Sequence, residues 1–249
     1  MKKWLVLSAA IMTFIFGGAL ANAEETGKVN VMIRYADSGV MPMSIESDDA
    51  VGDVETVELE VSEISAYKND PNVSYIEEDV RVKKAAFDGD WYIGFDNISD
   101  IYEDIGIAGE NVRVAVLDTG ISFCNGRQVS GGVNVLNSDE GFGDNNGHGT
   151  SMANIIASIV PEAEIYSVKV LDGSGEGYYS DVIAGINWAI DNGMDVICMS
   201  FGAFDYSYFL EEAVDRAFGA GIAMVAAAGN EGSDKMYYPA AYNQVISVG

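Results

Sequence analysis

Short apolar runs alternate with amphipathic stretches over the second half of the chain. The apolar runs are near-continuous, as is typical of strands that are buried on both faces of a sheet. The expected strands are 112–117, 165–171, 195–200, 222–228 and 245–248, and the expected helices are 150–160, 180–191 and 210–219. Strands and helices that alternate in this way predict an α/β fold, in which a mostly parallel sheet is covered by helices.

The pattern before residue 90 is different. It predicts strands at 28–35, 54–61 and 73–76 and a short helix at 62–68, with a turn cluster between that helix and the third strand. These elements form a small α+β unit that is rich in Asp and Glu and too small to be very stable on its own. Residues 36–53 predict no definite helix, and Lys83 to Asp90 are expected to form an exposed linker.

The N-terminus has the composition of a secretory signal peptide. Two lysines follow Met1, residues 4–20 are almost wholly apolar, and Ala21-Asn22-Ala23 supplies small residues at a cleavage site. The apolar run is somewhat short for a membrane anchor, which is the competing interpretation. We therefore expect cleavage after Ala23, an extracellular (secreted) protein, and no membrane attachment after cleavage.

Composition excludes some partners. The formal net charge is −26, and 49% of the residues are hydrophobic. The hydrophobic share is ample for a folded core. Nucleic acids and anionic membranes bind clusters of Lys and Arg, so the strong negative charge argues against both as partners.

The two cysteines, Cys124 and Cys198, are too few for a disulfide scaffold. Cys198 lies in an apolar run and is expected to be a small core residue. A bridge between the two is compatible with export but is not required by their spacing. With a single histidine and no C-x-x-C pair, the sequence assigns no metal ligands, and a metal-dependent hydrolase is disfavoured.

Polar motifs follow several of the predicted parallel strands. They are Asp118-Thr-Gly, the glycine-rich loop 173–177, Ser200-Phe-Gly and Gly229-Asn230. In parallel sheets the ligand sites lie beyond the carboxyl ends of the strands, so these motifs are expected to converge. The glycine-rich loop does not fit a dinucleotide site, because Tyr178 replaces a required glycine and Glu176 would repel phosphate.

His148 is the only histidine and lies between two glycines. An imidazole titrates near ~6.5, so it can both accept and donate a proton at neutral pH. Asp118 could orient the ring and stabilise its charged form, and the Asn230 amide could donate a hydrogen bond to a developing oxyanion. The plainer alternatives are a helix-capping histidine, a turn-capping carboxylate and a turn asparagine in left-handed conformation.

Four motifs in series resemble subtilisins. They are Val114–Ile121 (VAVLDTGI), Asp144–Thr150 (DNNGHGT), Asp195–Gly202 (DVICMSFG) and Val225–Gly232 (VAAAGNEG). The resemblance extends from about Trp91 to Gly249. It implies a subtilisin-like α/β fold and a secreted serine endopeptidase precursor that hydrolyses polypeptides.

By this resemblance Asp118 is the orienting carboxylate, His148 is the general base and Asn230 is an oxyanion donor. The substrate would lie as an added strand between two edges, formed by Gly175, Glu176 and Gly177 and by Ser200, Phe201 and Gly202. Ala227, Ala228 and Gly229 would form a wall of the first specificity pocket.

The resemblance also predicts the domain organisation. After the signal peptide 1–23, which its composition predicts, residues 24–86 would be an inhibitory and chaperoning propeptide with an α+β, ferredoxin-like fold. Residues 87–249 would be the N-terminal part of the catalytic domain. The chain's own propeptide would thus be an intramolecular inhibitor, with maturation near Lys84–Phe87.

Two features depart from the family pattern. The serine motif G-T-S-M-A-x-P is not found downstream of Asn230, and the similar run Gly149–Ala153 directly follows His148, where Ser151 is expected to be a plain helix residue. The chain by itself is therefore expected to be inactive; the alternative is a naturally truncated, non-catalytic relative that at most binds peptides. Calcium is possible, but the loop insertion that usually holds it is missing at 158–164.

Overall fold

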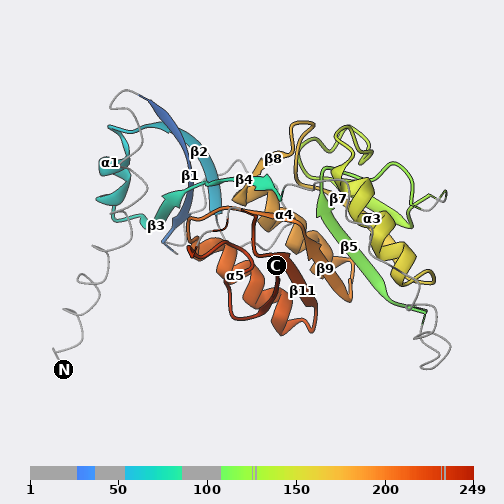
Figure 1. The fold of residues 1–249 in the computed structure, drawn as a ribbon. Helices are drawn as coiled ribbons and strands as arrows, with labels where there is room; N and C mark the ends of the chain where they lie inside the picture. Colours follow the sequence, from blue (N-terminus) through green and yellow to red (C-terminus); the bar gives the residue numbers. More distant parts are fainter. Residues whose placement is uncertain are drawn as a thin grey trace. The chain divides into compact units, whose positions relative to one another are not determined.

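The computed structural model describes residues 27–36, 54–85, 108–124, 126, 128–230, 232 and 234–249. The chain divides into two compact units, Met1–Asp79 and Val80–Gly249, which are described separately below (Figure 1). The expected signal peptide, the boundary at residues 86 and 87, and most of the expected maturation region lie outside the described residues. In the described part, no helix is long and apolar enough to span a membrane.

The smaller unit contains an antiparallel sheet with the strand order β2-β1-β3. Its described elements are β1 (Lys28–Tyr35), β2 (Val54–Glu60), α1 (Ile64–Lys68) and β3 (Val73–Glu78). One face of the sheet forms a small core from buried apolar residues on all three strands, including Val31, Leu59 and Ile76. The α+β composition agrees with the sequence pattern, whereas the ferredoxin-like arrangement stays a prediction.

The larger unit is built on a parallel sheet of six strands in the order β12-β11-β9-β5-β7-β6. These strands are β5 (Arg113–Asp118), β6 (Gly131–Asn134), β7 (Glu164–Lys169), β9 (Val196–Met199), β11 (Ala223–Ala227) and β12 (Val245–Val248). The helices are α3 (His148–Ile159), α4 (Tyr179–Asp191) and α5 (Tyr208–Gly219). The sequence-based prediction of a helix-covered, mostly parallel sheet is confirmed.

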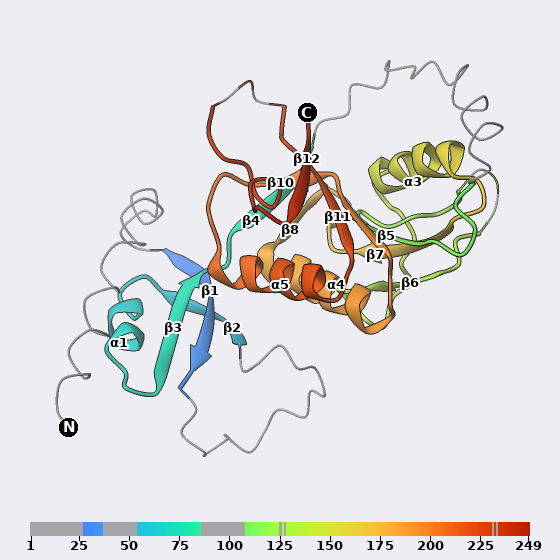
Figure 2. The same ribbon diagram turned by 90° about the horizontal axis from the view of Figure 1, so that it is seen from below.

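The helices cover both faces of this sheet, with α3 on one face and α4 and α5 on the other (Figure 2). Alternation along β5 explains the two layers: Val114 and Val116 pack in one cluster with Ala153 of α3. Leu117 points to the opposite face, where a Cβ added at Gly185 of α4 would lie 3.2 Å from its side chain. Asp118 follows Leu117 and therefore points to the α3 side.

A second, three-stranded sheet in the larger unit has the order β10-β4-β8. Its strands are β4 (Arg81–Lys84), β8 (Glu176–Tyr178) and β10 (Phe201–Gly202), and β4 is antiparallel to both neighbours. The expectation of an exposed linker is wrong at Lys83 and Lys84, because backbone pairing with two distant segments makes these residues part of a strand. The neighbouring Val82 is fully buried.

The two cysteines are not bonded to each other. Cys124 is buried in the cluster below α3, and Cys198 is half-buried on β9. The division between the compact units falls after Asp79, before the predicted boundary at residues 86 and 87. It reflects how β4 packs, and the processing boundary stays a prediction.

Candidate active site

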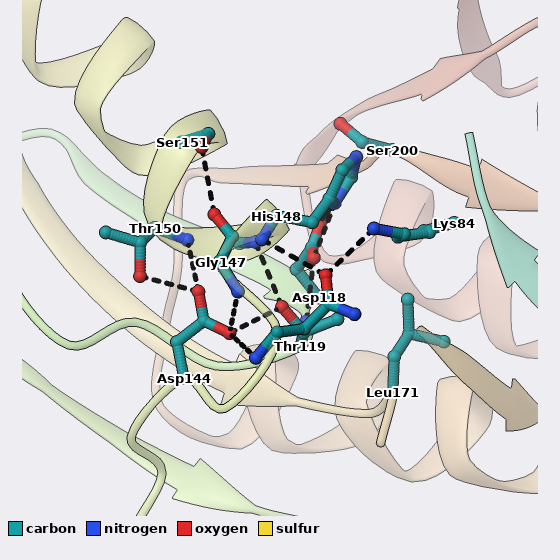
Figure 3. A network of polar contacts seen from close by, with 12 residues as sticks. Lys84, Asp118, Thr119, Asp144, Gly147, His148, Thr150, Ser151, Leu171 and Ser200 are labelled. Atoms are coloured by element: carbon teal, nitrogen blue, oxygen red, sulfur yellow. Dashed lines mark hydrogen bonds and ion pairs between the residues drawn. The ribbon is translucent and has the colours of Figure 1, made fainter. Parts of the chain in front are cut away.

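The centre of the candidate site is a buried pair formed by Asp118 and His148 (Figure 3). Asp118 is the last residue of β5, and His148 is the first residue of α3. The His148 Nδ1 atom lies 2.7 Å from Asp118 Oδ1 and 2.9 Å from Oδ2. The His148 side chain is only 3% exposed, and the Asp118 side chain is 0% exposed. A carboxylate can only accept, so Nδ1 carries the donated proton and Nε2 is left for another partner.

The backbone at the end of β5 and the start of α3 allows this close contact. The Thr119 N–H donates to Asp118 Oδ1 at 2.7 Å and fixes the carboxylate. A Cβ at Gly149 would lie 2.3 Å from the Gly120 carbonyl oxygen and 3.0 Å from Asp118 Cβ. Only glycine therefore fits at this position of the first helical turn. Gly147 precedes the helix in the left-handed region, with φ of 103°.

Asp144 caps the N-terminus of α3 from outside the helix. Its Oδ1 accepts from the Asn146 and Gly147 N–H groups, each at 2.8 Å, and from the Thr119 hydroxyl at 2.9 Å. Its Oδ2 accepts from the Thr150 N–H at 3.0 Å and from the Thr150 hydroxyl at 2.6 Å. The first turn of a helix has unpaired N–H groups and a positive dipole end, so a carboxylate is stabilising there.

The hydrogen bonds to Asp144 also change its acidity. Burial alone would raise the pKa of this carboxyl, but the bonds from Gly147, Thr150 and Asn146 outweigh burial and bring the pKa below its ordinary value. Sequence reasoning quoted Asp144 within a motif but gave it no function. The available signal was an acidic residue just before a predicted helix start.

Lys169 is the last residue of β7 and contacts the turn that follows Asp118. Its Nζ donates to the carbonyl oxygens of Thr119 and Leu171 and, at 3.0 Å, to Asn145 Oδ1. Burial lowers the pKa of this ammonium, while nearby carboxylates, including Asp144, oppose that shift. The charge and the three bonds hold the turn after β5 in place. Sequence reasoning missed this residue, although a lysine in an apolar strand run was a signal.

The six residues expected to hold an extended peptide flank β4. The Lys84 N–H donates to the Gly175 carbonyl oxygen at 2.9 Å, and the Ala85 N–H donates to the Ser200 carbonyl oxygen at 2.8 Å. The cross-strand partners are Val82 with Gly177, Lys83 with Glu176 and Gly202, and Lys84 with Phe201. Residues 81–85 thus lie as a middle strand between the two edges.

Asn230 and the three residues before it are at the same edge of the parallel sheet as Asp118. Strand β11 runs parallel to β9, which runs parallel to β5, and β11 ends at Ala227. Gly229 has φ of 91°, and Asn230 is exposed. The topology therefore places residues 227–230 at the carboxyl ends of the strands, and their functions stay predictions.

Ser151 is a residue of α3 whose hydroxyl donates to the Gly147 carbonyl oxygen at 2.9 Å. It belongs to the same helical turn as His148, so its position relative to the ring is fixed by the helix. Across the described parts of the chain, no group of three or more His, Cys, Asp or Glu side chains is arranged to hold a metal ion.

Comparison with known proteins gives a consistent result. The subtilase family model matches residues 109–249. The thermostable alkaline protease of Halalkalibacterium halodurans is 38% identical over 263 residues, which cover 99% of this chain and 72% of that protein. Subtilisin E of Bacillus subtilis is 35% identical over 282 residues, covering 100% of this chain and 74% of its own length.

M-protease of Shouchella clausii is 33% identical over 279 residues, which cover 99% of this chain and 73% of that protein. The family match includes β5, which ends with Asp118, and α3, which begins with His148. It also includes Ser200 and Asn230, which follow β9 and β11. Family, fold and site geometry agree, and the chain is a member of the subtilase family of serine proteases.

Proposed function

We propose that this chain is part of a secreted endopeptidase precursor of the subtilisin type and carries the acid–base part of its site. The observation that carries the proposal is the buried Asp118–His148 pair, with a 2.7 Å bond between carboxylate and imidazole. It lies at the carboxyl edge of the parallel sheet, where such sheets place their chemistry. The proposed substrates are polypeptides.

In the proposed reaction, His148 Nε2 accepts the proton of a serine hydroxyl as the oxygen attacks the scissile carbonyl carbon. Asp118 holds the ring in the required tautomer and stabilises the imidazolium. The Asn230 amide donates to the oxyanion of the tetrahedral intermediate. His148 then gives its proton to the leaving amine, and water hydrolyses the acyl-enzyme by the same steps. Side chains supply every proton transfer, so no cofactor is part of this proposal.

We propose that the nucleophile is a serine outside residues 1–249. Ser151 does not suit this function, because its hydroxyl donates to the Gly147 carbonyl oxygen and it lies in the same turn of α3 as His148, which fixes its position relative to the ring. Removal of the serine from subtilisin itself lowers turnover about a millionfold. The 249-residue chain by itself should therefore show negligible peptidase activity.

The segment 24–86 is proposed to be a propeptide that inhibits the site and assists folding. In support, residues 81–85 occupy the middle-strand position that a substrate would take between β8 and β10. Backbone bonds on both sides make such a strand a competitor for any peptide. Residues 1–23 are proposed to direct secretion and to be removed afterwards.

The coding DNA beyond the Gly249 codon tests this proposal. An open frame that continues to a G-T-S-M-A-x-P segment supports an active endopeptidase. A stop codon at that place would overturn it in favour of the non-catalytic alternative, a relative that binds peptides between β8 and β10.

A biochemical assay gives an independent test. With a fluorogenic peptide, the hydrolysis rate of the purified 249-residue chain and of its Ser151→Ala variant should not exceed the rate in buffer alone. Clear turnover by the unchanged chain that disappears in Ser151→Ala would show that Ser151 is the nucleophile and would contradict the proposed mechanism.

A further inference from the structure

Strand β4 is unusually basic for this protein. It contains Arg81, Lys83 and Lys84, three of the 13 Lys and Arg residues in a chain with a formal net charge of −26. The strand lies between β8 and β10, where the proposed function puts the substrate. The side chains that contact β4 therefore indicate which substrate residues this groove recognises.

Glu176 of β8 binds two of the three basic residues. Its Oε2 atom lies 2.8 Å from Arg81 Nη1, and its Oε1 atom lies 2.8 Å from Lys83 Nζ. Arg81 and Lys83 are two residues apart, so they project from the same face of the strand. One carboxylate thus uses both oxygens to bind alternate basic side chains. The hydrogen bond from Lys83 is the main cause that holds the pKa of Glu176 below its ordinary value.

Tyr178, also on β8, adds contacts that suit an arginine. Its hydroxyl accepts a hydrogen bond from Arg81 Nη2 at 2.8 Å. The Arg81 guanidinium carbon lies 5.2 Å from the centre of the tyrosine ring, within cation–π range. Together Glu176 and Tyr178 contact both terminal nitrogens of the Arg81 guanidinium. A neutral side chain in place of Arg81 could not make this set of contacts.

The other face of β4 is formed by Val82 and Lys84, and Lys84 contacts the segment just before α3. Val82 is fully buried. The aliphatic part of Lys84 covers Gly175, where an added Cβ would lie 2.6 Å from Lys84 Cδ. Its Nζ donates at 2.9 Å to Asn146 Oδ1, two residues before His148. The Asn146 amide is fixed in turn by its bond to the Gly173 carbonyl oxygen at 2.9 Å.

We propose that the groove between β8 and β10 selects the pattern basic–apolar–basic–basic, and that the substrates of this protein are basic polypeptide segments. Glu176 and Tyr178 recognise the first basic residue, Glu176 the second and Asn146 the third. The substrate part rests on the proposed endopeptidase function, whereas the selection of basic side chains by the groove does not.

Hydrogen exchange in the 249-residue chain tests the selection directly. The Lys84 and Ala85 amides donate to the carbonyl oxygens of Gly175 and Ser200 only while β4 is in place, so their exchange reports its release. Exposed ion pairs typically change such equilibria by roughly 1.4- to 5-fold each. Loss of both pairs in Glu176→Gln should therefore speed exchange of these amides by roughly twofold to twenty-fivefold at low salt.

The matched control is Glu162→Gln, which removes the same charge from an exposed loop. It should leave hydrogen exchange of the Lys84 and Ala85 amides unchanged. Exchange of the amides in β5 and β7 should be unchanged in both variants, because neither substitution disturbs the fold. Wild-type exchange in Glu176→Gln would overturn the proposal.

Charge reversal gives a second variant set. Arg81→Glu with Lys83→Glu should release β4, and the addition of Glu176→Lys should restore much of the lost protection, because the pairs are re-formed with opposite sign. Failure of this rescue would show that Glu176 is not the recognition element.

The substrate part is tested on a protein that also carries the nucleophile. A peptide containing Arg-Val-Lys-Lys-Ala should have at least tenfold higher kcat/KM than one containing Gln-Val-Gln-Gln-Ala, and Glu176→Gln should reduce that ratio. Equal hydrolysis of both peptides would overturn the substrate class and leave the endopeptidase function standing. Hydrolysis of neither would overturn that function together with the substrate class, while the exchange data still decide the selection.

Discussion

At the residue scale, the proposed function depends on one imidazole. His148 is the only histidine in the chain, so its ring signals in an NMR spectrum need no assignment. The Nδ1 proton is buried and shared with the Asp118 carboxylate. Charge-assisted hydrogen bonds of this kind are short and strong.

We predict a downfield, slowly exchanging imidazole N–H signal from this ring in the 249-residue chain. Asp118→Asn should weaken or remove the signal, because the neutral amide is a poorer acceptor. One-dimensional proton NMR measures it, with Asp139→Asn on an exposed loop as the control. A signal of equal position and strength in Asp118→Asn would contradict the pairing.

Asp144 is the second residue whose contribution can be measured. Four of its five hydrogen bonds come from residues 146–150 at the start of α3, and the fifth comes from the Thr119 hydroxyl. Asp144→Ala should therefore lower the free energy of unfolding by about 2 kcal/mol. Urea denaturation at neutral pH measures this loss. Asp139→Ala, which removes an exposed carboxylate, should change stability by less than about 0.5 kcal/mol.

The same residue predicts a pH dependence. The folded pKa of Asp144 is lowered, so its stabilisation is fully present above the unfolded value near ~3.9 and is lost as pH falls through the folded pKa. The stability difference between wild type and Asp144→Ala should therefore be constant from pH 5 to 7 and shrink below about pH 4. A difference that grows on acidification would contradict this sign.

At the element scale, the site depends on how closely α3 approaches the end of β5. Gly149→Ala would place a methyl group 2.3 Å from the Gly120 carbonyl oxygen, so the helix must shift away from Asp118. We predict a loss of about 1–3 kcal/mol in unfolding free energy. Ser151→Ala, two residues along the same helix and half-buried, removes only a hydroxyl bonded to the Gly147 carbonyl oxygen and should cost less than about 1 kcal/mol. Equal effects of the two substitutions would show that the close approach is not strained.

The sequence predicted the elements that have a strong pattern of their own. Strands β5, β7, β9 and β11 lie in apolar-rich runs, which identified them to within about two residues. Strand β4 could not be found this way, because Arg-Val-Lys-Lys has no strand pattern and is fixed by partners about 95 and 120 residues away. The short strands β8 and β10 were missed as strands for the same reason, although their residues were expected to hold a peptide.

At the scale of the whole molecule, the fold brings distant residues to one edge of a parallel sheet. Asp118 and His148 are 30 residues apart in sequence. They meet because the end of β5 lies next to the start of α3. Their pairing followed from spacing and family resemblance. Lys169 did not, because only the packed structure shows that β7 delivers its ammonium to the turn after β5.

The central claim is that this fold positions Asp118 and His148 for serine-dependent peptide hydrolysis. The most direct measurement is the kcat of a protein that includes the nucleophile, compared with its Asp118→Asn variant on one peptide substrate. Loss of the orienting carboxylate in serine proteases costs about 10⁴-fold in kcat, and we predict a loss of that order. Unchanged turnover in Asp118→Asn, or no turnover in the unchanged protein, would contradict the account.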